Sequence, residues 1–232
     1  MNIVYAMTRN VYEWILPSIR SLAAHHPGAR VFILAEDDTL PFDLPIKAEV
    51  INISRQAVFP EIAAHRQEAF GGYINHLKVC YPSLLPVKKV IHLDLDTIVC
   101  DSLEPLWKTD VSGRWFAAVP ESQTWYRPFG SVYYNMGVAL INLGQMRADG
   151  AEAMMADFLL GTDQPFADQN AWNKYGAEMD KAAALDTRFN ESRVTGITDN
   201  PAIVHYCAIP DWWTNRDMFR RSEEHTSELQ SL

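Results

Sequence analysis

Short apolar runs alternate along the chain with segments whose apolar residues recur every three to four positions. The opening shows the pattern, because strand-like runs at 2–7 and 30–35 enclose residues 11–22, whose apolar positions fit one face of a helix. Pro17 lacks a backbone N–H, so this helix is expected to begin near Pro17 or to kink there. Strand–helix–strand units of this kind favour a mainly parallel sheet covered by helices.

The same pattern continues through the rest of the chain and predicts one domain. The most strongly apolar strand is 89–95, which reads Lys-Val-Ile-His-Leu-Asp-Leu. No internal repeat or flexible linker interrupts residues 1–220, so we expect a single α/β, Rossmann-like domain with a mainly parallel central sheet and flanking helices. The other expected strands are 48–53, 115–119 and 137–142, and the other expected helices are 66–81, 151–160 and 168–175.

Composition narrows the class of protein. Of the 232 residues 48% are hydrophobic, which is enough for one sizeable core. A formal net charge of −9 argues against a nucleic-acid partner, because such surfaces rest on Lys and Arg. No apolar run of about 18 residues could span a bilayer, and the N-terminus reads as a strand rather than a signal peptide. Three cysteines without CxxC spacing fit reduced thiols in a cytoplasmic protein.

The last segment, 221–232, differs in character from the rest of the chain. It reads Arg-Ser-Glu-Glu-His-Thr-Ser-Glu-Leu-Gln-Ser-Leu and resembles the in-frame translation of a sequencing-library adapter. We expect that this tail is not native, makes no core contact and replaces a natural C-terminus that could have attached the protein to a membrane surface. The alternative is an ordinary polar, disordered terminus.

Two acids at the end of the 89–95 strand introduce the chemistry. Asp94 and Asp96 are spaced i, i+2 at the carboxyl end of an apolar strand, where open α/β sheets place their ligands. On a regular strand their side chains would point to opposite faces, so joint binding of one cation requires the chain to turn at Asp96. Carboxylate oxygens suit Mg²⁺ or Mn²⁺, which keep further positions for substrate phosphates. The alternative is that the two acids simply end a strand.

Four further segments favour the cation site. They are 73–86, which leads into the acidic strand, then 134–143, 168–170 and 204–206. The segment 134–143, Tyr-Asn-Met-Gly-Val-Ala-Leu-Ile-Asn-Leu, is the longest and most specific. In this order and spacing they resemble glycosyltransferase family 8 over roughly residues 2–213, the retaining enzymes of the glycogenin and bacterial lipooligosaccharide galactosyltransferase kind. The resemblance implies a GT-A fold and metal-dependent transfer of a hexose from a UDP-sugar to a hydroxyl of a glycan or glycoconjugate.

The resemblance also implies roles for particular residues. Asp94, Asp96 and His205 would hold Mn²⁺ or Mg²⁺, while Asp168 and Gln169 would act at the reacting sugar. The donor would further contact Ala6, Thr8, Tyr12, Lys78 and Asn135. Each role has a plainer alternative: His205 as a hydrogen-bonded core residue, Tyr12 as a core aromatic, Asn135 as a turn residue, and Asp168 as a helix N-cap with Gln169 and Asn170 solvated.

One segment departs from the family pattern. A lysine that meets the diphosphate is expected shortly after His205, where this chain has Asp211, whose carboxylate would repel a diphosphate. Arg216 could serve instead if gaps shift the alignment. Two other classes therefore stay open. One is a non-catalytic nucleotide-sugar or glycan-binding module with the same fold, and the other is a haloacid-dehalogenase-like phosphatase that uses Asp94 as its nucleophile.

Overall fold

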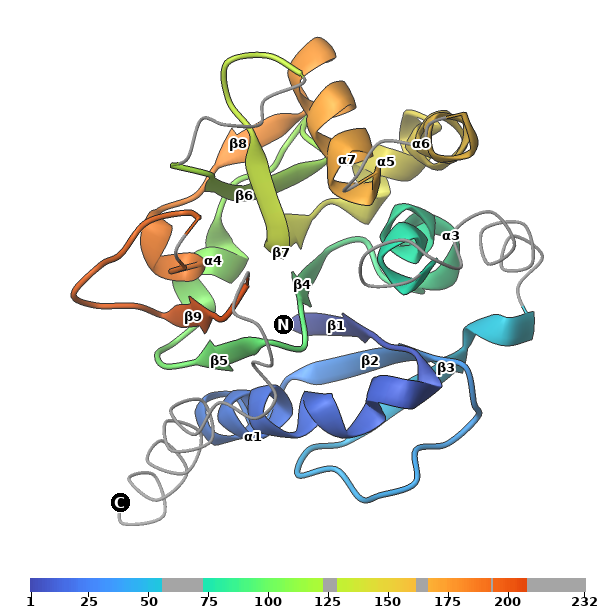
Figure 1. The fold of residues 1–232 in the computed structure, drawn as a ribbon, viewed down its shortest axis with the longest axis vertical. Coiled ribbons are helices and arrows are strands. Elements are labelled where there is room, and N and C mark those ends of the chain that lie inside the picture. Colours follow the sequence, from blue (N-terminus) through green and yellow to red (C-terminus); the bar gives the residue numbers. More distant parts are fainter. Residues whose placement is uncertain (56–72, 123–128, 162–166, 193, 208–232) are drawn as a thin grey trace.

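The computed structural model describes residues 1–55, 73–122, 129–161, 167–192 and 194–207. Seven of its strands form the central sheet: β1 (Asn2–Ala6), β2 (Arg30–Ala35), β3 (Ala48–Asn52), β4 (Val90–Leu93), β6 (Phe116–Pro120), β7 (Tyr134–Ile141) and β8 (Ala182–Ala184). Their order across the sheet is β3-β2-β1-β4-β7-β6-β8 (Figure 1). A separate two-stranded sheet pairs β5 (Thr97–Val99), which follows β4 after a short turn, with β9 (Ile203–His205).

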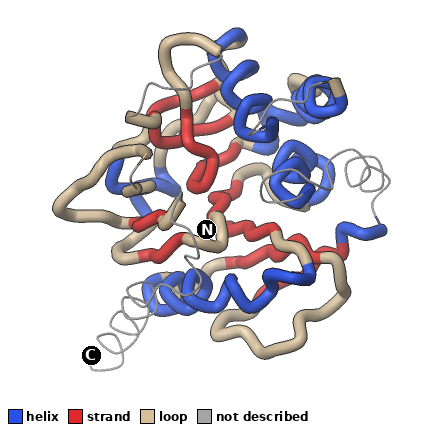
Figure 2. Tube along the Cα trace, viewed as in Figure 1, coloured by secondary structure: helices blue, strands red, loops and turns tan. Residues whose placement is uncertain are grey.

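Helices cover both faces of the central sheet (Figure 2). They are η1 (Arg9–Trp14), α1 (Ile15–His25), η2 (Ile53–Arg55), η3 (Tyr73–Cys80), α3 (Tyr81–Leu84), α4 (Glu104–Lys108), α5 (Leu143–Ala148), α6 (Ala151–Leu160), α7 (Ala167–Glu178) and η4 (Thr187–Phe189). Buried residues of α1 pack with Ile3 and Tyr5 of β1, whereas those of α3, α5, α6 and α7 pack in a second cluster with Val4. Strand β1 is therefore buried on both sides, as parallel strands usually are. Within the described residues, no helix is long and apolar enough to cross a membrane.

The predicted mainly parallel sheet with flanking helices is confirmed. The β3–β2, β2–β1, β1–β4 and β6–β8 pairs are parallel. Strand β7 runs antiparallel to both of its neighbours, β4 and β6, an arrangement the hydrophobic pattern does not reveal. Helix α1 begins two residues before Pro17, which therefore lies in the first turn, where a backbone N–H has no intrahelical partner to lose.

Two predicted strands differ from the observed strands by more than one residue at one end. The strand expected at 89–95 ends at Leu93, since the chain turns immediately after it. The strand expected at 137–142 begins at Tyr134 instead. The polar Asn135 lies buried inside this strand, where an apolar pattern does not predict it. Three-residue strands such as β5, β8 and β9 are too short to show a clear period of two, and the sequence did not predict their pairing.

The helix expected at 66–81 is only partly within the described residues, which resume at Tyr73. From there to Cys80 the chain is a 3₁₀ helix, and it continues as an α-helix to Leu84, beyond the predicted end. The domain limit at 220 and the tail 221–232 also lie outside the described residues, so both stay predictions.

Candidate functional site

The turn after β4 places the two acids of the predicted cation site. The Asp94 N–H donates to the Gly137 carbonyl at 2.8 Å, which ties the end of β4 to β7. The Thr97 hydroxyl then donates to the Asp94 carbonyl at 2.7 Å, closing a turn through Leu95 and Asp96. The chain therefore turns where joint binding of one cation requires it, and the two carboxylates no longer point to opposite faces.

Strand β9 brings His205 to these carboxylates. In the antiparallel pair of β5 and β9, His205 lies opposite Thr97, directly after Asp96 in the chain. His205 Nε2 is 3.1 Å from Asp96 Oδ1 and 4.0 Å from Asp94 Oδ2. One ligand atom from each of the three side chains lies within 4.8 Å of the others. The sequence prediction that residues 94, 96 and 205 converge is thus confirmed, and together they could hold one divalent cation.

Gly137 is needed for the approach of His205. A Cβ atom on Gly137 would lie 2.1 Å from Cε1 of the His205 ring, far inside van der Waals contact. The same glycine supplies the carbonyl that holds Asp94. The glycine of the 134–143 segment therefore serves both the carboxylate and the imidazole.

Asn190, which the sequence analysis did not single out, fixes the orientation of the His205 ring. The Gly137 N–H donates to Asn135 Oδ1 at 3.1 Å, which identifies the Asn135 oxygen. The Asn190 amide nitrogen donates to that oxygen at 2.9 Å, so Asn190 Oδ1 faces His205 Nδ1 at 2.8 Å. His205 Nδ1 consequently carries a hydrogen, and Nε2 is the atom turned to the carboxylates. Asn190 belongs to no recognisable motif, and only its complete burial marks it.

Glu121 joins the two amide residues predicted at the sugar. Glu121 Oε1 accepts from Asn135 Nδ2 at 3.1 Å and from Gln169 Nε2 at 3.2 Å. Gln169 Oε1 in turn accepts the Met136 N–H at 3.0 Å, so both ends of this amide are held. The structure therefore places Asn135 and Gln169 side by side. Glu121 was not predicted from the sequence, although it is an acid that follows a strand just as Asp94 does.

Lys78 lies buried between two acids. Its Nζ is 2.8 Å from Asp94 Oδ1 and 3.9 Å from Asp168 Oδ2. Burial by itself would lower the pKa of Lys78, but the Asp94 and Asp168 carboxylates outweigh it and the pKa is raised, so Lys78 remains charged. With Asp96, three carboxylates face one ammonium, which leaves a net charge of 1 − 3 = −2 when His205 is neutral. Such a surplus of negative charge favours a divalent cation.

The surroundings of Asp94 and His205 shift the pKa values of both side chains. Burial would raise the pKa of Asp94, but Lys78 and His92 lower it well below its usual range. Burial would lower the pKa of His205, yet Cys207 and Asp96 raise it well above the usual value, so without a cation Nε2 carries a proton. Binding of a cation at Nε2 would displace that proton.

The N-cap alternative for Asp168 is wrong. Helix α7 begins at Ala167, so Asp168 lies within its first turn, where it is 7% exposed. Asn170, expected in that alternative to be solvated, is fully buried and accepts the Tyr133 hydroxyl at 2.7 Å.

The residues predicted at the nucleotide lie at the carboxyl ends of β1 and β2. Ala6 is the last residue of β1, and Thr8 directly precedes η1. The Tyr12 hydroxyl donates to Asp37 Oδ2 at 3.1 Å and accepts the Glu36 N–H at 3.0 Å. Asp37 also holds Arg9 through two hydrogen bonds, at 2.8 and 2.9 Å. Arg9, Tyr12 and Asp37 line a hollow of about 660 Å³ between η1 and the loop that follows β2.

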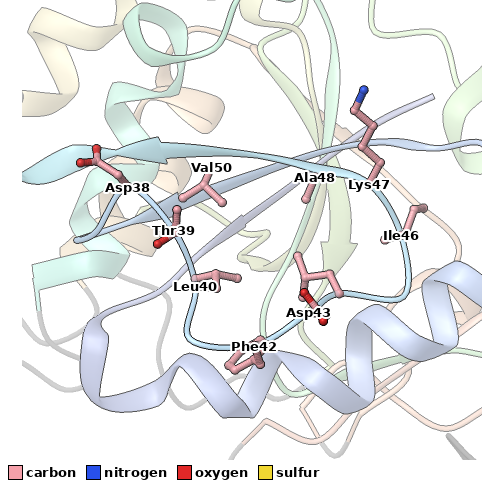
Figure 3. A pocket seen from close by; sticks show the side chains of 10 residues that line it. Asp38, Thr39, Leu40, Phe42, Asp43, Ile46, Lys47, Ala48 and Val50 are labelled. Carbon is pink, nitrogen blue, oxygen red and sulfur yellow. The ribbon is translucent and has the colours of Figure 1, made fainter.

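A second hollow, of about 480 Å³, lies beside β3 and shares Asp38, Thr39 and Leu40 with the first (Figure 3). It is lined by the loop that leads into β3 and by β3 itself, with Leu40, Phe42 and Val50 among its apolar side chains. Strands β2 and β1 separate β3 from β4, so this hollow is not part of the acidic site. Asp211 and Arg216 lie outside the described residues, and the repulsion expected from Asp211 stays a prediction.

Comparison with known proteins gives a consistent result. The family model "Glycosyl transferase family 8" matches residues 2–215. General stress protein A of Bacillus subtilis is 22% identical over 82% of this chain and 74% of its own length. Glycosyltransferase GlyB of Streptococcus pneumoniae is 19% identical over 91% of this chain, which spans only 57% of that relative.

Solved structures share the fold at low identity. The galactosyltransferase LgtC, crystallised with donor and acceptor sugar analogues, superposes with a TM-score of 0.71 at 21% identity and covers 97% of this chain and 96% of its own. The glycosyltransferase GlyE of Streptococcus pneumoniae gives a TM-score of 0.74 at 17% identity, with 99% of this chain and 63% of that chain covered.

Proposed function

The chain belongs to glycosyl transferase family 8 and is a glycosyltransferase, and from this premise we propose that it moves a hexose from a UDP-sugar to an acceptor hydroxyl with retention of anomeric configuration. Asp94, Asp96 and His205 would hold Mn²⁺ or Mg²⁺. The observation that carries the proposal is their convergence within 4.8 Å, at a site with surplus negative charge. The family match excludes the phosphatase alternative.

Two carboxylates and one imidazole suit such a cation, because Mg²⁺ and Mn²⁺ prefer oxygen and Mn²⁺ also accepts nitrogen ligands. When bound, the ion would neutralise charge on the diphosphate leaving group. The Asp94 side chain is 29% exposed and that of Asp96 15%, so a ligand can reach both.

Asn135 and Gln169 support the sugar end of the site. Their amides are joined through Glu121 and anchored to the β7 backbone, so their positions are fixed before a substrate binds. An amide is a poor nucleophile, and the Gln169 oxygen already accepts a hydrogen bond. We therefore favour front-face attack by the acceptor hydroxyl over a covalent glycosyl intermediate on Gln169.

The nucleotide end of the donor would occupy the hollow beside Tyr12. It lies at the carboxyl end of the parallel strands, where α/β folds bind ligands. Ala6, Thr8 and Lys78 would complete the donor contacts, and a glycan or glycoconjugate would supply the acceptor hydroxyl.

A cytoplasmic setting is supported by the three cysteines, all within the described residues, which form no disulfide with one another.

Release of UDP tests the proposal. UDP-glucose and UDP-galactose are incubated with the protein in Mn²⁺, in Mg²⁺ and in excess EDTA, and free UDP is measured by chromatography. We expect slow release that requires the ion and falls at least a hundredfold in Asp94→Asn, since removal of transition-state charge stabilisation costs about 10²–10³ in rate. The Asp110→Asn variant, at an exposed loop carboxylate, should keep the parent rate. Equal release in EDTA, or none in any condition, would contradict metal-dependent UDP-sugar chemistry.

A further inference from the structure

His92 is a buried histidine next to the acidic pair. It lies in β4, two residues before Asp94, and is 1% exposed. Its Nε2 is 2.8 Å from Asp94 Oδ1, and its Nδ1 is 3.0 Å from the hydroxyl of Tyr81. Tyr81, the first residue of α3, is fully buried. Neither residue belongs to the predicted cation site. His92 contacts the Asp94 carboxylate of that site directly, and Tyr81 is linked to the same carboxylate through His92.

The hydrogen-bond roles in this chain follow from its ends. A carboxylate oxygen can only accept, so His92 Nε2 carries the hydrogen that Asp94 Oδ1 receives. A neutral His92 then has a lone pair on Nδ1, which accepts the hydroxyl hydrogen of Tyr81. The two hydrogen bonds therefore run in one direction: the Tyr81 hydroxyl donates to His92, and His92 donates to Asp94.

The two oxygens of Asp94 have different surroundings. Oδ1 receives two donors, Lys78 Nζ and His92 Nε2, each at 2.8 Å. Oδ2 is the oxygen that faces His205 Nε2, at 4.0 Å. With Oδ1 occupied by donors from the protein, the carboxylate cannot rotate freely, and it presents Oδ2 to the space shared with His205 and Asp96.

We propose that His92 and Tyr81 are positioning residues that hold the Asp94 carboxylate so that Oδ2 alone faces the cation. The proposal rests on the proposed function, since it presupposes that a cation binds there. Partners that orient a metal ligand typically contribute 10–100-fold to metal affinity. Loss of the His92 donor should therefore weaken cation binding, although His92 itself is not a ligand.

Three variants separate positioning from packing. His92→Phe keeps a buried ring but removes the donor to Asp94, and we expect its Mn²⁺ dissociation constant to rise 10–100-fold. His92→Gln can present its amide N–H at nearly the position of His92 Nε2, so it should remain within about fivefold of the parent. Tyr81→Phe removes only the hydroxyl that fixes the His92 ring, and it should weaken binding by a smaller factor. Ile91→Val, a change at the neighbouring buried position of β4, should leave affinity unchanged.

The measurement is a titration of each protein with Mn²⁺, in which free aquo-Mn²⁺ is followed by electron paramagnetic resonance. Circular dichroism and thermal unfolding without metal identify variants that do not fold. If His92→Phe binds as tightly as the parent, or if His92→Gln is as weak as His92→Phe, the positioning role is overturned. Should His92→Phe fail to fold, unchanged affinity in Tyr81→Phe would overturn it equally. A parent protein that binds no Mn²⁺ would instead remove the cation site on which the proposed function depends.

Discussion

At the scale of single residues, backbone N–H groups decide how the polar side chains of the site are oriented. The Gly137 N–H fixes the oxygen of Asn135, and through Asn190 this places a hydrogen on His205 Nδ1. The Met136 N–H fixes Gln169 in the same way. Two consecutive amides of β7 thus orient both the His205 imidazole and the Gln169 amide.

Gly137→Ala should damage this arrangement. The new methyl group would lie 2.1 Å from Cε1 of a His205 ring that Asn190 holds in place. We expect the ring to be displaced from Asp94 and Asp96, with at least a tenfold loss of Mn²⁺ affinity and about 1–3 kcal/mol of unfolding free energy from overpacking. Calorimetric titration and urea unfolding measure the two effects. Gly28→Ala, where a Cβ meets nothing within 4 Å, should leave Mn²⁺ affinity unchanged.

At the scale of elements, the sequence predicted the framework better than the site. The acids at the end of the 89–95 strand and the late histidine could be assigned, because apolar periodicity and a family motif mark them. Asn190 could not, since it lies outside every predicted element and is brought to His205 by β9, whose three residues show no clear periodicity. Glu121 carries only the weak signal of an acid after a predicted strand, and it meets Asn135 through the antiparallel pairing of β6 with β7. Asn135 resembles a turn residue in sequence, and only the buried amide network explains it inside a strand.

A hydrogen bond between the residue after α1 and the residue before α4 predicts a pH effect on stability. His26, just after α1, accepts the Leu103 N–H at 2.8 Å through Nε2, so it must be neutral there. Burial lowers the pKa of His26 below its usual value. A lowered folded-state pKa gives stability that is present above the unfolded pKa of about 6.5 and is lost as pH falls through the folded pKa.

Urea unfolding at pH 7.5 and pH 5.0 checks this effect. The unfolding free energy of the parent should fall toward pH 5.0, and His26→Leu should show a smaller fall. At pH 7.5, His26→Leu should be less stable by about 1–3 kcal/mol, because the Leu103 N–H loses its acceptor. Equal pH dependence in the two proteins would show that His26 does not titrate in this way.

At the scale of the whole molecule, a cation bound by residues from distant segments should stabilise the entire fold. At a free Mn²⁺ concentration about a hundred times the dissociation constant, binding to the native state adds about 2.7 kcal/mol. For a chain of this size that raises the melting temperature by about 5–10 °C. A thermal scan should show this shift in the parent and its reversal by EDTA. The double variant Asp94→Asn, Asp96→Asn should show no shift, and an equal shift there would place the ion elsewhere.

The small sheet of β5 and β9 has a consequence for the order in which the protein becomes functional. All seven strands of the central sheet precede β9 in the chain, so a ribosome releases the framework before it releases His205. Asp94 and Asp96 must therefore wait for a partner that is synthesised after every strand of the central sheet. A cation held by Asp94, Asp96 and His205 would close the stretch of chain between Asp94 and His205 into a loop. Binding of the cation would have to offset the entropy that this loop closure costs. Metal occupancy would thus report that the chain has been extended through β9, and a copy that stops before β9 would have the central sheet without the third ligand residue.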